Sequence, residues 1–236
     1  DNFAGVNGAT GNPNVGSAFL ADTVNGVQAT SLNATLAVNT PATPISGGPV
    51  PTLITTLGST YGDVSVPAGT PAGVYTISYK LCQSPTNPTN CKDATITVTV
   101  MPPVIDAVND TFSAANGATG NPNVGNAISA NDLLNGATPT VGATGNSVMT
   151  VVTPAAPIFG APAGSFVPVV DPTTGIVSVP AGTPAGAYTI NYRLCEKLNP
   201  TNCDNATITV NVAAAPIVAV NDPLPSTNGA TGNPTA

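Results

Sequence analysis

The stretch AYTINYRLCEKLNPTNCDNATITVNV, residues 187–212, consists of two alternating runs joined by a short loop with a cysteine at each end. In both runs every second residue is apolar. These residues are Tyr188, Ile190, Tyr192 and Leu194 in the first run and Ala206, Ile208, Val210 and Val212 in the second. Because successive side chains of a β-strand point to opposite faces, the stretch predicts two strands that bury one face and expose the other.

Nearly the same stretch occurs earlier in the chain, as VYTISYKLCQSPTNPTNCKDATITVTV at residues 74–100. Two further motifs also recur: NGATGNPNVG at 7–16 and 116–125, and VSVPAGTPAG at 64–73 and 177–186; NGATGNP starts once more at Asn228. A period of about 110 residues is the size of a small domain and predicts a tandem array. We therefore expect a first repeat at 1–101, a second at 102–214, and a C-terminal segment at 215–236 that begins a third copy or acts as a donor strand.

The composition favours an ordered all-β fold. Hydrophobic residues make up 42% of the chain and charged residues only 6%, and 24 glycines and 25 prolines punctuate short runs rich in Val, Ile and Thr. Further strands are predicted at 147–153, 165–170 and 175–180, with a turn at Asn131–Gly136. About seven short strands per copy, separated by turns, predict an antiparallel β-sandwich of the immunoglobulin-like type in each repeat.

Charge excludes several classes of partner. The formal net charge is −7, and the basic residues are Lys80, Lys92, Arg193 and Lys197. Such a chain has no basic patch for nucleic acid. No apolar run approaches the 18 residues or so that suggest a transmembrane helix, so no membrane insertion is expected.

Four cysteines form two matched pairs, Cys82 with Cys91 and Cys195 with Cys203, each at the open end of a predicted hairpin. That position brings the two Cα atoms within disulfide reach. The alternative is a metal site, but two cysteines in a repeat without His cannot supply four ligands. We predict two disulfides, which indicate an oxidising, extracytoplasmic compartment.

The residues GDVSVPAGTPAGVYTISYKLCQSPTNPTNCKDATITVTV (62–100) and their second copy resemble the C-terminal half of immunoglobulin-like repeats in large bacterial surface adhesins and extracellular matrix proteins. NDLLNG at 131–136 and ADTVNG at 21–26 are similar to the early turn of those repeats. The resemblance implies a bacterial, secreted, repetitive protein that extends from the cell. It implies no ligand, because such repeats usually act as stalk modules.

Candidate chemistry is sparse. Asp1, Asp110 and Asp222 recur at the start of each copy and are weak candidates for Ca²⁺, with Asp22 and Asp132 as a second recurring pair. The same Asn-Asp sequence also terminates a strand and caps a turn. These carboxylates are too few for a full shell, so no cofactor is expected. No enzyme is expected either, since the chain has no His, and Glu196 is replaced by Gln83 in the first copy.

The segment Pro103–Asn109 (PVIDAVN) precedes Asp110 in the second copy, whereas the first copy starts at Asp1 and is expected to lack this opening strand. A related segment follows the second copy. Its residues are Pro216, Ile217, Val218, Ala219, Val220 and Asn221. This segment predicts two alternatives: addition of the strand to the open edge of a neighbouring copy, giving a head-to-tail filament, or excision of the chain from a longer tandem array.

The sequence therefore predicts a structural subunit or segment of a bacterial extracellular fibre or surface stalk that functions in surface or biofilm adhesion. The alternative function is a binding module that recognises a glycan or a host protein through its loops. The region that differs most between the copies lies between the early turn and the VSVP strand, so binding specificity would be expected there.

Overall fold

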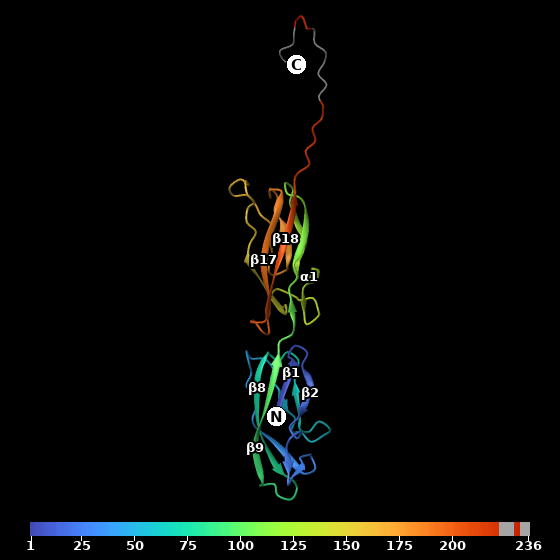
Figure 1. Cartoon of the computed structure of the whole chain (residues 1–236), viewed down its shortest axis with the longest axis vertical. Coiled ribbons are helices and arrows are strands. Elements are labelled where there is room, and N and C mark those ends of the chain that lie inside the picture. The colour runs from blue at the N-terminus through green and yellow to red at the C-terminus, as the bar shows by residue number, and fades with distance from the viewer. Residues whose placement is uncertain (222–228, 232–236) are drawn as a thin grey trace.

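The computed structural model describes residues 1–221 and 229–231 and shows two β-sandwiches that follow each other along the long axis of the chain (Figure 1). The first hydrophobic core draws on residues between Val6 and Val100, and the second on residues between Ala107 and Val212. Among the described residues, the one helix has five residues, and no helix is long and apolar enough to cross a membrane.

In the first repeat, one sheet has the order β1-β9-β8-β5 and the other has the order β2-β7-β6, with a small β3-β4 hairpin beside them. The strands are β1 (Asn2–Asn7), β2 (Asn12–Ser17), β3 (Thr23–Val24), β4 (Val27–Gln28), β5 (Ala34–Thr40), β6 (Thr52–Leu53), β7 (Asp63–Val66), β8 (Gly73–Gln83) and β9 (Cys91–Met101). The first and last strands, β1 and β9, pair in parallel, whereas the other pairs are antiparallel.

The second repeat reproduces this plan with sheets β11-β18-β17-β14 and β12-β16-β15. Its elements are β10 (Ile105–Asp106), β11 (Asp110–Asn116), β12 (Asn121–Asn126), α1 (Ala127–Asn131), β13 (Leu133–Leu134), β14 (Ser147–Thr153), β15 (Val169–Val170), β16 (Ile176–Val179), β17 (Gly186–Glu196) and β18 (Cys203–Ala213). Again β11 and β18 are parallel. One feature is new: the short β10 pairs with β13.

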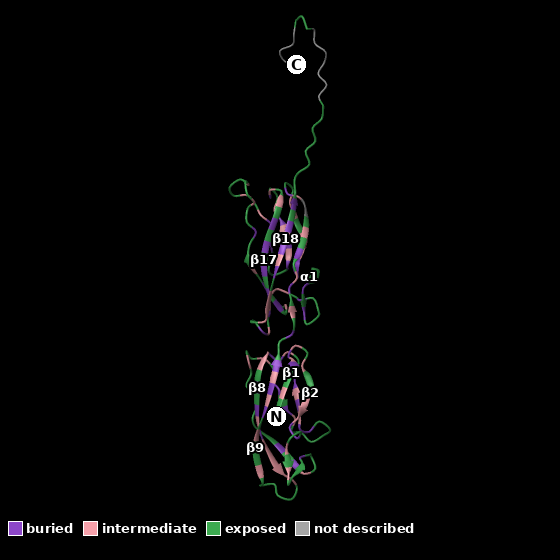
Figure 2. Ribbon diagram, viewed as in Figure 1, coloured by how far each residue is buried: buried purple, intermediate pink, exposed green. Residues whose placement is uncertain are grey.

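The alternating pattern of the sequence becomes the core. Along β17 and β18 every predicted inward side chain is buried, and the residues between them are mostly exposed or partly exposed (Figure 2). On β8 and β9 the same pattern holds, with Leu81 and Ala94 only partly buried. The hairpin that β17 and β18 form is continuous, since Gly186 to Cys195 pairs residue by residue with Val212 to Cys203.

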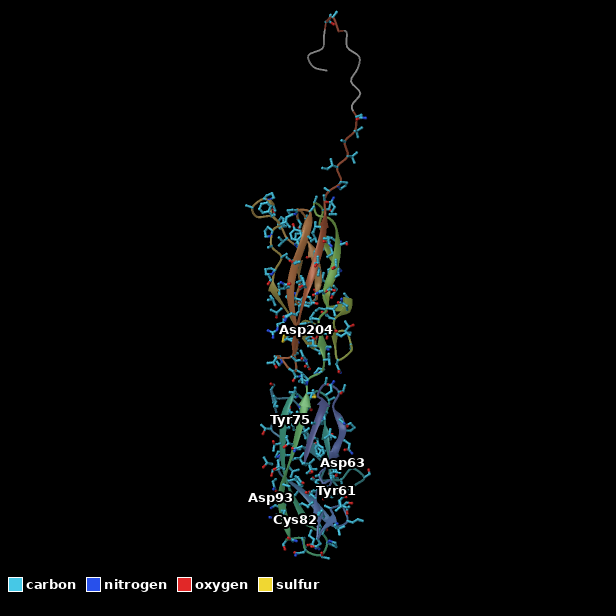
Figure 3. All side chains as sticks on the ribbon, in the orientation of Figure 1. Tyr61, Asp63, Tyr75, Cys82, Asp93 and Asp204 are labelled. Carbon is cyan, nitrogen blue, oxygen red and sulfur yellow. A yellow bond between two sulfur atoms is a disulfide. The ribbon has the colours of Figure 1, made fainter. Side chains whose placement is uncertain are left out.

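Both expected disulfides are present. Cys82 is bonded to Cys91 with a Cα–Cα distance of 4.0 Å, and Cys195 to Cys203 with 4.1 Å. Each closes the open end of its hairpin, because the paired cysteines stand opposite each other in the ladder. Cys82 lies near the end of the first repeat that points away from the second (Figure 3).

The main sheets of the two repeats contain the same strands. The main sheet of the first repeat has β1, the counterpart of β11, in the same parallel pairing with the last strand. Within Pro103–Asn109 only the two residues of β10 form a strand. Outside β10, the amides of Ala107 and Val108 and the carbonyl of Pro103 bind side chains, as described below. The segment Pro103–Asn109 has no counterpart in the first repeat; its strand β10 pairs with β13, whereas β3, the counterpart of β13, pairs only with β4.

Candidate functional site: the junction between the repeats

The recurring motifs NGATGNPNVG and VSVPAGTPAG contact each other at one end of each sandwich. The amides of Gly69 and Thr70 donate to the carbonyl of Gly8 at 2.9 and 3.1 Å, and in the second repeat the amide of Gly182 donates to Gly117 at 2.9 Å. A Cβ on Gly8 would lie 2.1 Å from the Thr70 carbonyl oxygen, so only glycine permits this approach. In the first repeat this end, which we call the upper face, points toward the second repeat (Figure 1).

Two hydrogen bonds connect the upper face of the first repeat to the lower end of the second. Asn7 Nδ2 donates to Asn135 Oδ1 at 2.8 Å, and the amide of Ala72 donates to Asn199 Oδ1 at 2.6 Å. Asn199 is held in turn by donating through Nδ2 to the buried carboxylate of Glu196 at 2.7 Å. The short loop between Cys195 and Cys203 is therefore an interdomain contact rather than a free surface loop.

Two clefts flank these hydrogen bonds. One, of about 620 Å³, lies between Ala9 and Gly69 of the first repeat and Asn135, Glu196 and Leu198 of the second. The other, of about 430 Å³, lies between Ile45, Ser46 and Pro71 on one side and Leu198 and Asn199 on the other. The two sandwiches thus touch at a few polar points and are not packed closely across the whole junction.

The linker itself is built into the second repeat. We call Pro103–Asn109 the strap. Its carbonyls accept from the second repeat: Val104 O from the amide of Asn135 at 2.8 Å and Pro103 O from Asn202 Nδ2 at 2.9 Å. Its amides donate to carboxylates: Ala107 N to Asp204 Oδ2 at 3.0 Å and Val108 N to Asp132 Oδ1 at 2.8 Å. Asp204 lies at the lower end of the second repeat, close to the linker (Figure 3).

Asp132 joins the strap to the core. Besides the amide of Val108, its carboxylate accepts from the Tyr192 hydroxyl at 2.8 and 3.0 Å, and Tyr192 also donates to Val108 O at 3.4 Å. Asp132 is 1% exposed and Tyr192 is 0% exposed. Burial raises the pKa of Asp132. The hydrogen bonds from Val108 and Tyr192 lower it, but by less than burial raises it. A buried carboxylate needs such donors, so removing either partner leaves the other unsatisfied.

Asp110, the calcium candidate of the second repeat, lies beside this arrangement. It is 4% exposed, and its Oδ2 atom is buried without a hydrogen-bond partner. Burial, and then the negative charge of Asp132, raises the pKa of Asp110 from 3.8 to about 7. Within residues 1–221 and 229–231, no group of three or more His, Cys, Asp or Glu side chains is placed to hold a metal ion.

The other candidates are not brought together. Asp1 lies at the start of the first repeat, where its ammonium group donates to Thr95 O at 3.0 Å and its Oδ2 is buried without a partner. Asp222 lies outside the described residues. The proposed assembly segment Pro216–Asn221 forms no strand and is exposed. Its largest side chains, Ile217 and Val218, are 93% and 82% exposed.

Some residues of the junction were not singled out by sequence reasoning. Asn199 and Asn202 act through buried hydrogen bonds to Glu196, and Lys197 Nζ donates to the carbonyls of Gly142, Ala143 and Gly145 at 2.7 to 3.0 Å. The sequence NPTN occurs in both copies, at 87–90 and 199–202, and this recurrence could have identified Asn199 and Asn202 as candidate site residues. For Lys197 there was no such signal, because three carbonyls converge only in the fold.

No family model and no curated protein matches the sequence. Similar solved structures include the mouse clustered protocadherin PcdhgC3 EC1-3, with 14% identity and a TM-score of 0.33 over 77% of this chain and 55% of that chain. Human mucin-like protocadherin EC1-2 has 11% identity and a TM-score of 0.34 over 91% and 96%, and protocadherin gamma B2 has 13% and 0.38 over 81% and 42%. The chain therefore spans about half the length of the first of these.

Proposed function

We propose that the chain is a structural, non-enzymatic module of a bacterial extracellular fibre or surface stalk, serving adhesion. The two disulfides support an oxidising, extracytoplasmic location. The end-to-end arrangement of two nearly identical sandwiches supports a spacing role, because copies of one unit extend a chain without adding a new site (Figure 1).

The observation that carries the proposal is the parallel pairing of the first and last strands of each sandwich. In the second repeat, β11 and β18 pair in register from Asp110 opposite Ile208 to Ala114 opposite Val212. The chain enters at the lower end of β11 and leaves at the upper end of β18 (Figure 1). Tension along the axis therefore pulls the two strands past each other, and their hydrogen bonds must break together instead of one by one.

The strap continues this path of tension between the repeats. Its hydrogen bonds to Asp132, Asp204, Asn135 and Asn202 attach the linker to the second repeat before β11 begins. A pull on the linker is therefore distributed over several side chains and not applied to one peptide group. Such an arrangement suits a module that carries force between a surface and its target.

The test is single-molecule stretching of the chain between two handles, with the disulfides intact. We expect two unfolding events of similar, high force. Ser113→Pro, which removes an amide from β11 in the shear path, should lower the force of one event. Thr150→Pro in the edge strand β14, compared at matched thermal stability, should lower it less. Equal forces in both variants, or unfolding at forces no higher than those of sandwiches pulled apart strand by strand, would refute the mechanical role.

The second candidate, a module that binds a glycan or host protein, is favoured by one observation. The loop between β14 and β15, where the copies differ most in sequence, presents Phe159 fully to solvent. A glycan array and a panel of host matrix proteins, probed with the native chain and with Phe159→Ser, test this role. Specific binding that is lost in the variant would favour it over the purely structural role.

A further inference from the structure

We propose that the larger cleft between the two repeats binds a neutral saccharide unit, whose hydroxyl groups contact the carboxylate of Glu196 and the amides of Asn135 and Asn146. This cleft, which we call the junction cleft, separates Ala9 and Gly69 of the first repeat from the second repeat. Its volume of about 620 Å³ lies within the range typical of ligand sites. The proposal goes beyond the structural function and rests on polar groups that the junction leaves without a partner.

Glu196 supplies a hydrogen-bond acceptor to the junction cleft. The residue is 4% exposed, and its Oε2 atom accepts from Asn199 Nδ2 at 2.7 Å and from Asn202 Nδ2 at 3.1 Å. Among the described residues, none donates to Oε1. This oxygen keeps contact with solvent, since the buried side-chain oxygens without a partner in the described part of the chain belong to Asp1 and Asp110. Because Glu196 lines the junction cleft, Oε1 opens into it.

The equivalent position of the first repeat has both of its polar atoms satisfied. Gln83, the counterpart of Glu196, accepts from Asn90 Nδ2 at 3.1 Å and donates through Nε2 to Thr86 Oγ1 at 2.8 Å. When the two loops are aligned on NPTN, Leu198 takes the place of Thr86 and offers no polar group. The change from glutamine and threonine to glutamate and leucine therefore leaves one carboxylate oxygen without a protein donor, which a ligand can supply.

The adjacent lysine does not occupy this oxygen. Lys197 also lines the junction cleft, but its ammonium group donates to three carbonyls within residues 142–145 at 2.7 to 3.0 Å. In the part of the chain that the structure describes, it forms no ion pair with Glu196. The lysine charge nevertheless offsets the charge of the carboxylate, so the lining of the cleft has no net charge. Neither a cationic nor an anionic ligand is favoured by such a lining.

Two side-chain amides add hydrogen-bond donors to the junction cleft. Asn135 Oδ1 accepts from Asn7 Nδ2 at 2.8 Å, and Asn146 Oδ1 accepts from the amide of Thr140 at 2.8 Å and from the hydroxyl of Ser147 at 3.1 Å. Their oxygens are therefore fixed by the protein. Neither Nδ2 group donates to another described residue, and both asparagines line the cleft. The cleft thus offers one carboxylate acceptor together with two amide donors.

Hydroxyl groups match this set, because each hydroxyl both donates and accepts, and neighbouring hydroxyls of a sugar can bind a carboxylate and an amide together. An ammonium group would satisfy Glu196 but would face the amide donors with further donors. A peptide directs successive N–H and C=O groups to opposite sides of its chain, whereas hydroxyls surround a sugar ring. The apolar side chains of Leu134, Ala137 and Leu198 line the same cleft and suit the C–H faces of such a ring.

The test is proton–nitrogen NMR of the 236-residue chain, titrated with the methyl glycosides of glucose, galactose, mannose and N-acetylglucosamine. We expect at least one of them to shift the side-chain amide signals of Asn135 and Asn146. Glu196→Gln installs the residue of the first repeat and replaces the acceptor in the cleft by a donor, so it should weaken binding by about tenfold or more. Asn146→Asp keeps Oδ1 and removes the donor, and should weaken binding similarly.

Three further variants locate the site. Ala9→Leu narrows the junction cleft from the side of the first repeat and should also weaken binding, although it leaves every polar group of the second repeat in place. Gln83→Glu, the reverse exchange at the equivalent position outside the cleft, should leave binding unchanged. Phe159→Ser should leave it unchanged as well, which separates this site from the exposed loop between β14 and β15. Thermal melting of each variant checks that both repeats remain folded.

Two sets of results would overturn the proposal. The site is wrong if no neutral glycoside binds, or if Glu196→Gln and Asn146→Asp, once shown to be folded, bind as the native chain does. The ligand class is wrong if methyl glucosaminide, methyl glucuronide or the neutral peptide acetyl-alanine amide binds more tightly than every neutral glycoside. Single-molecule stretching is carried out without sugar, so either failure leaves the mechanical role standing.

Discussion

At the lower end of each sandwich an equivalent tyrosine donates to an equivalent aspartate, but only in the second repeat does the strap cover the pair. In the second repeat the strap lies over Asp132 and Tyr192, and Asp132 serves both the tyrosine and the amide of Val108. In the first repeat Tyr79 is equally buried and binds Asp22, but Asp22 stays partly exposed. The Tyr–Asp pair therefore belongs to the sandwich itself, and the strap is an addition to it. Identical substitutions in the two repeats can measure what the strap adds.

The largest effect is expected from Asp132→Ala. It leaves the Val108 amide without its acceptor in a buried site and the Tyr192 hydroxyl with only Val108 O at 3.4 Å, which should lower the free energy of unfolding of the second repeat by about 3 kcal/mol. Asp22→Ala should cost the first repeat only about 1 kcal/mol, because Asp22 is partly exposed and accepts no strap amide, and Tyr79 keeps Ala18 O as a partner. Hydrogen exchange during denaturation reports the repeats separately. Equal losses in both would contradict the comparison.

Removal of the disulfides comes next. The two bridges span sequence separations of 9 and 8 residues, so loop entropy predicts a similar loss for each double Cys→Ala variant, about 2.5 kcal/mol. The loss should be larger for Cys195 and Cys203, because their loop also supplies Asn202 to the strap and Asn199 to the first repeat. Chemical denaturation of the two double variants, followed by hydrogen exchange, measures the difference.

The pH dependence should separate the repeats through Asp110. Since its pKa is raised from 3.8 to about 7, the folded second repeat binds a proton that the unfolded chain releases. The stabilisation is fully present below pH 3.8 and is lost as the pH rises through 7. Between pH 5 and pH 8 this amounts to a decrease on the order of 2 kcal/mol. Asp110→Asn should weaken this dependence and leave the part that comes from the raised pKa of Asp132. Thermal melting of both proteins across this range, with no difference in slope, would count against it.

The smallest effect is expected at the contact between the sandwiches. Asn199→Ala removes the acceptor of the Ala72 amide and one of two donors to Glu196, at a cost of about 1 kcal/mol. The fold should survive, while the angle between the repeats becomes less restricted. Small-angle scattering of the chain and of Asn87→Ala, the matched change in the first repeat, checks this. A broadened shape distribution is expected for Asn199→Ala alone.

The sequence by itself determined the repetition, the β-sandwich and the bridges. The alternation at Tyr188–Leu194 and Ala206–Val212 identifies the buried face, because a strand places every second side chain on one side. The position of the cysteines at the open end of that hairpin predicts the disulfide. It did not reveal β12 in NPNVG, where proline, asparagine and glycine weaken every strand signal.

Only the tertiary structure decided what the repeated motifs are for. The approach of Gly8 to Thr70, the clamp of Asp132 on Val108 and the bond from Ala72 to Asn199 join residues distant in the sequence. Local pattern carries no information about such partners, since a buried carboxylate or amide is satisfied by whichever donor the fold brings near it. Pro103–Asn109 shows the same limit: its apolar residues predict a strand along the whole segment, but only Ile105 and Asp106 pair with β13, and the amides of Ala107 and Val108 donate to carboxylates.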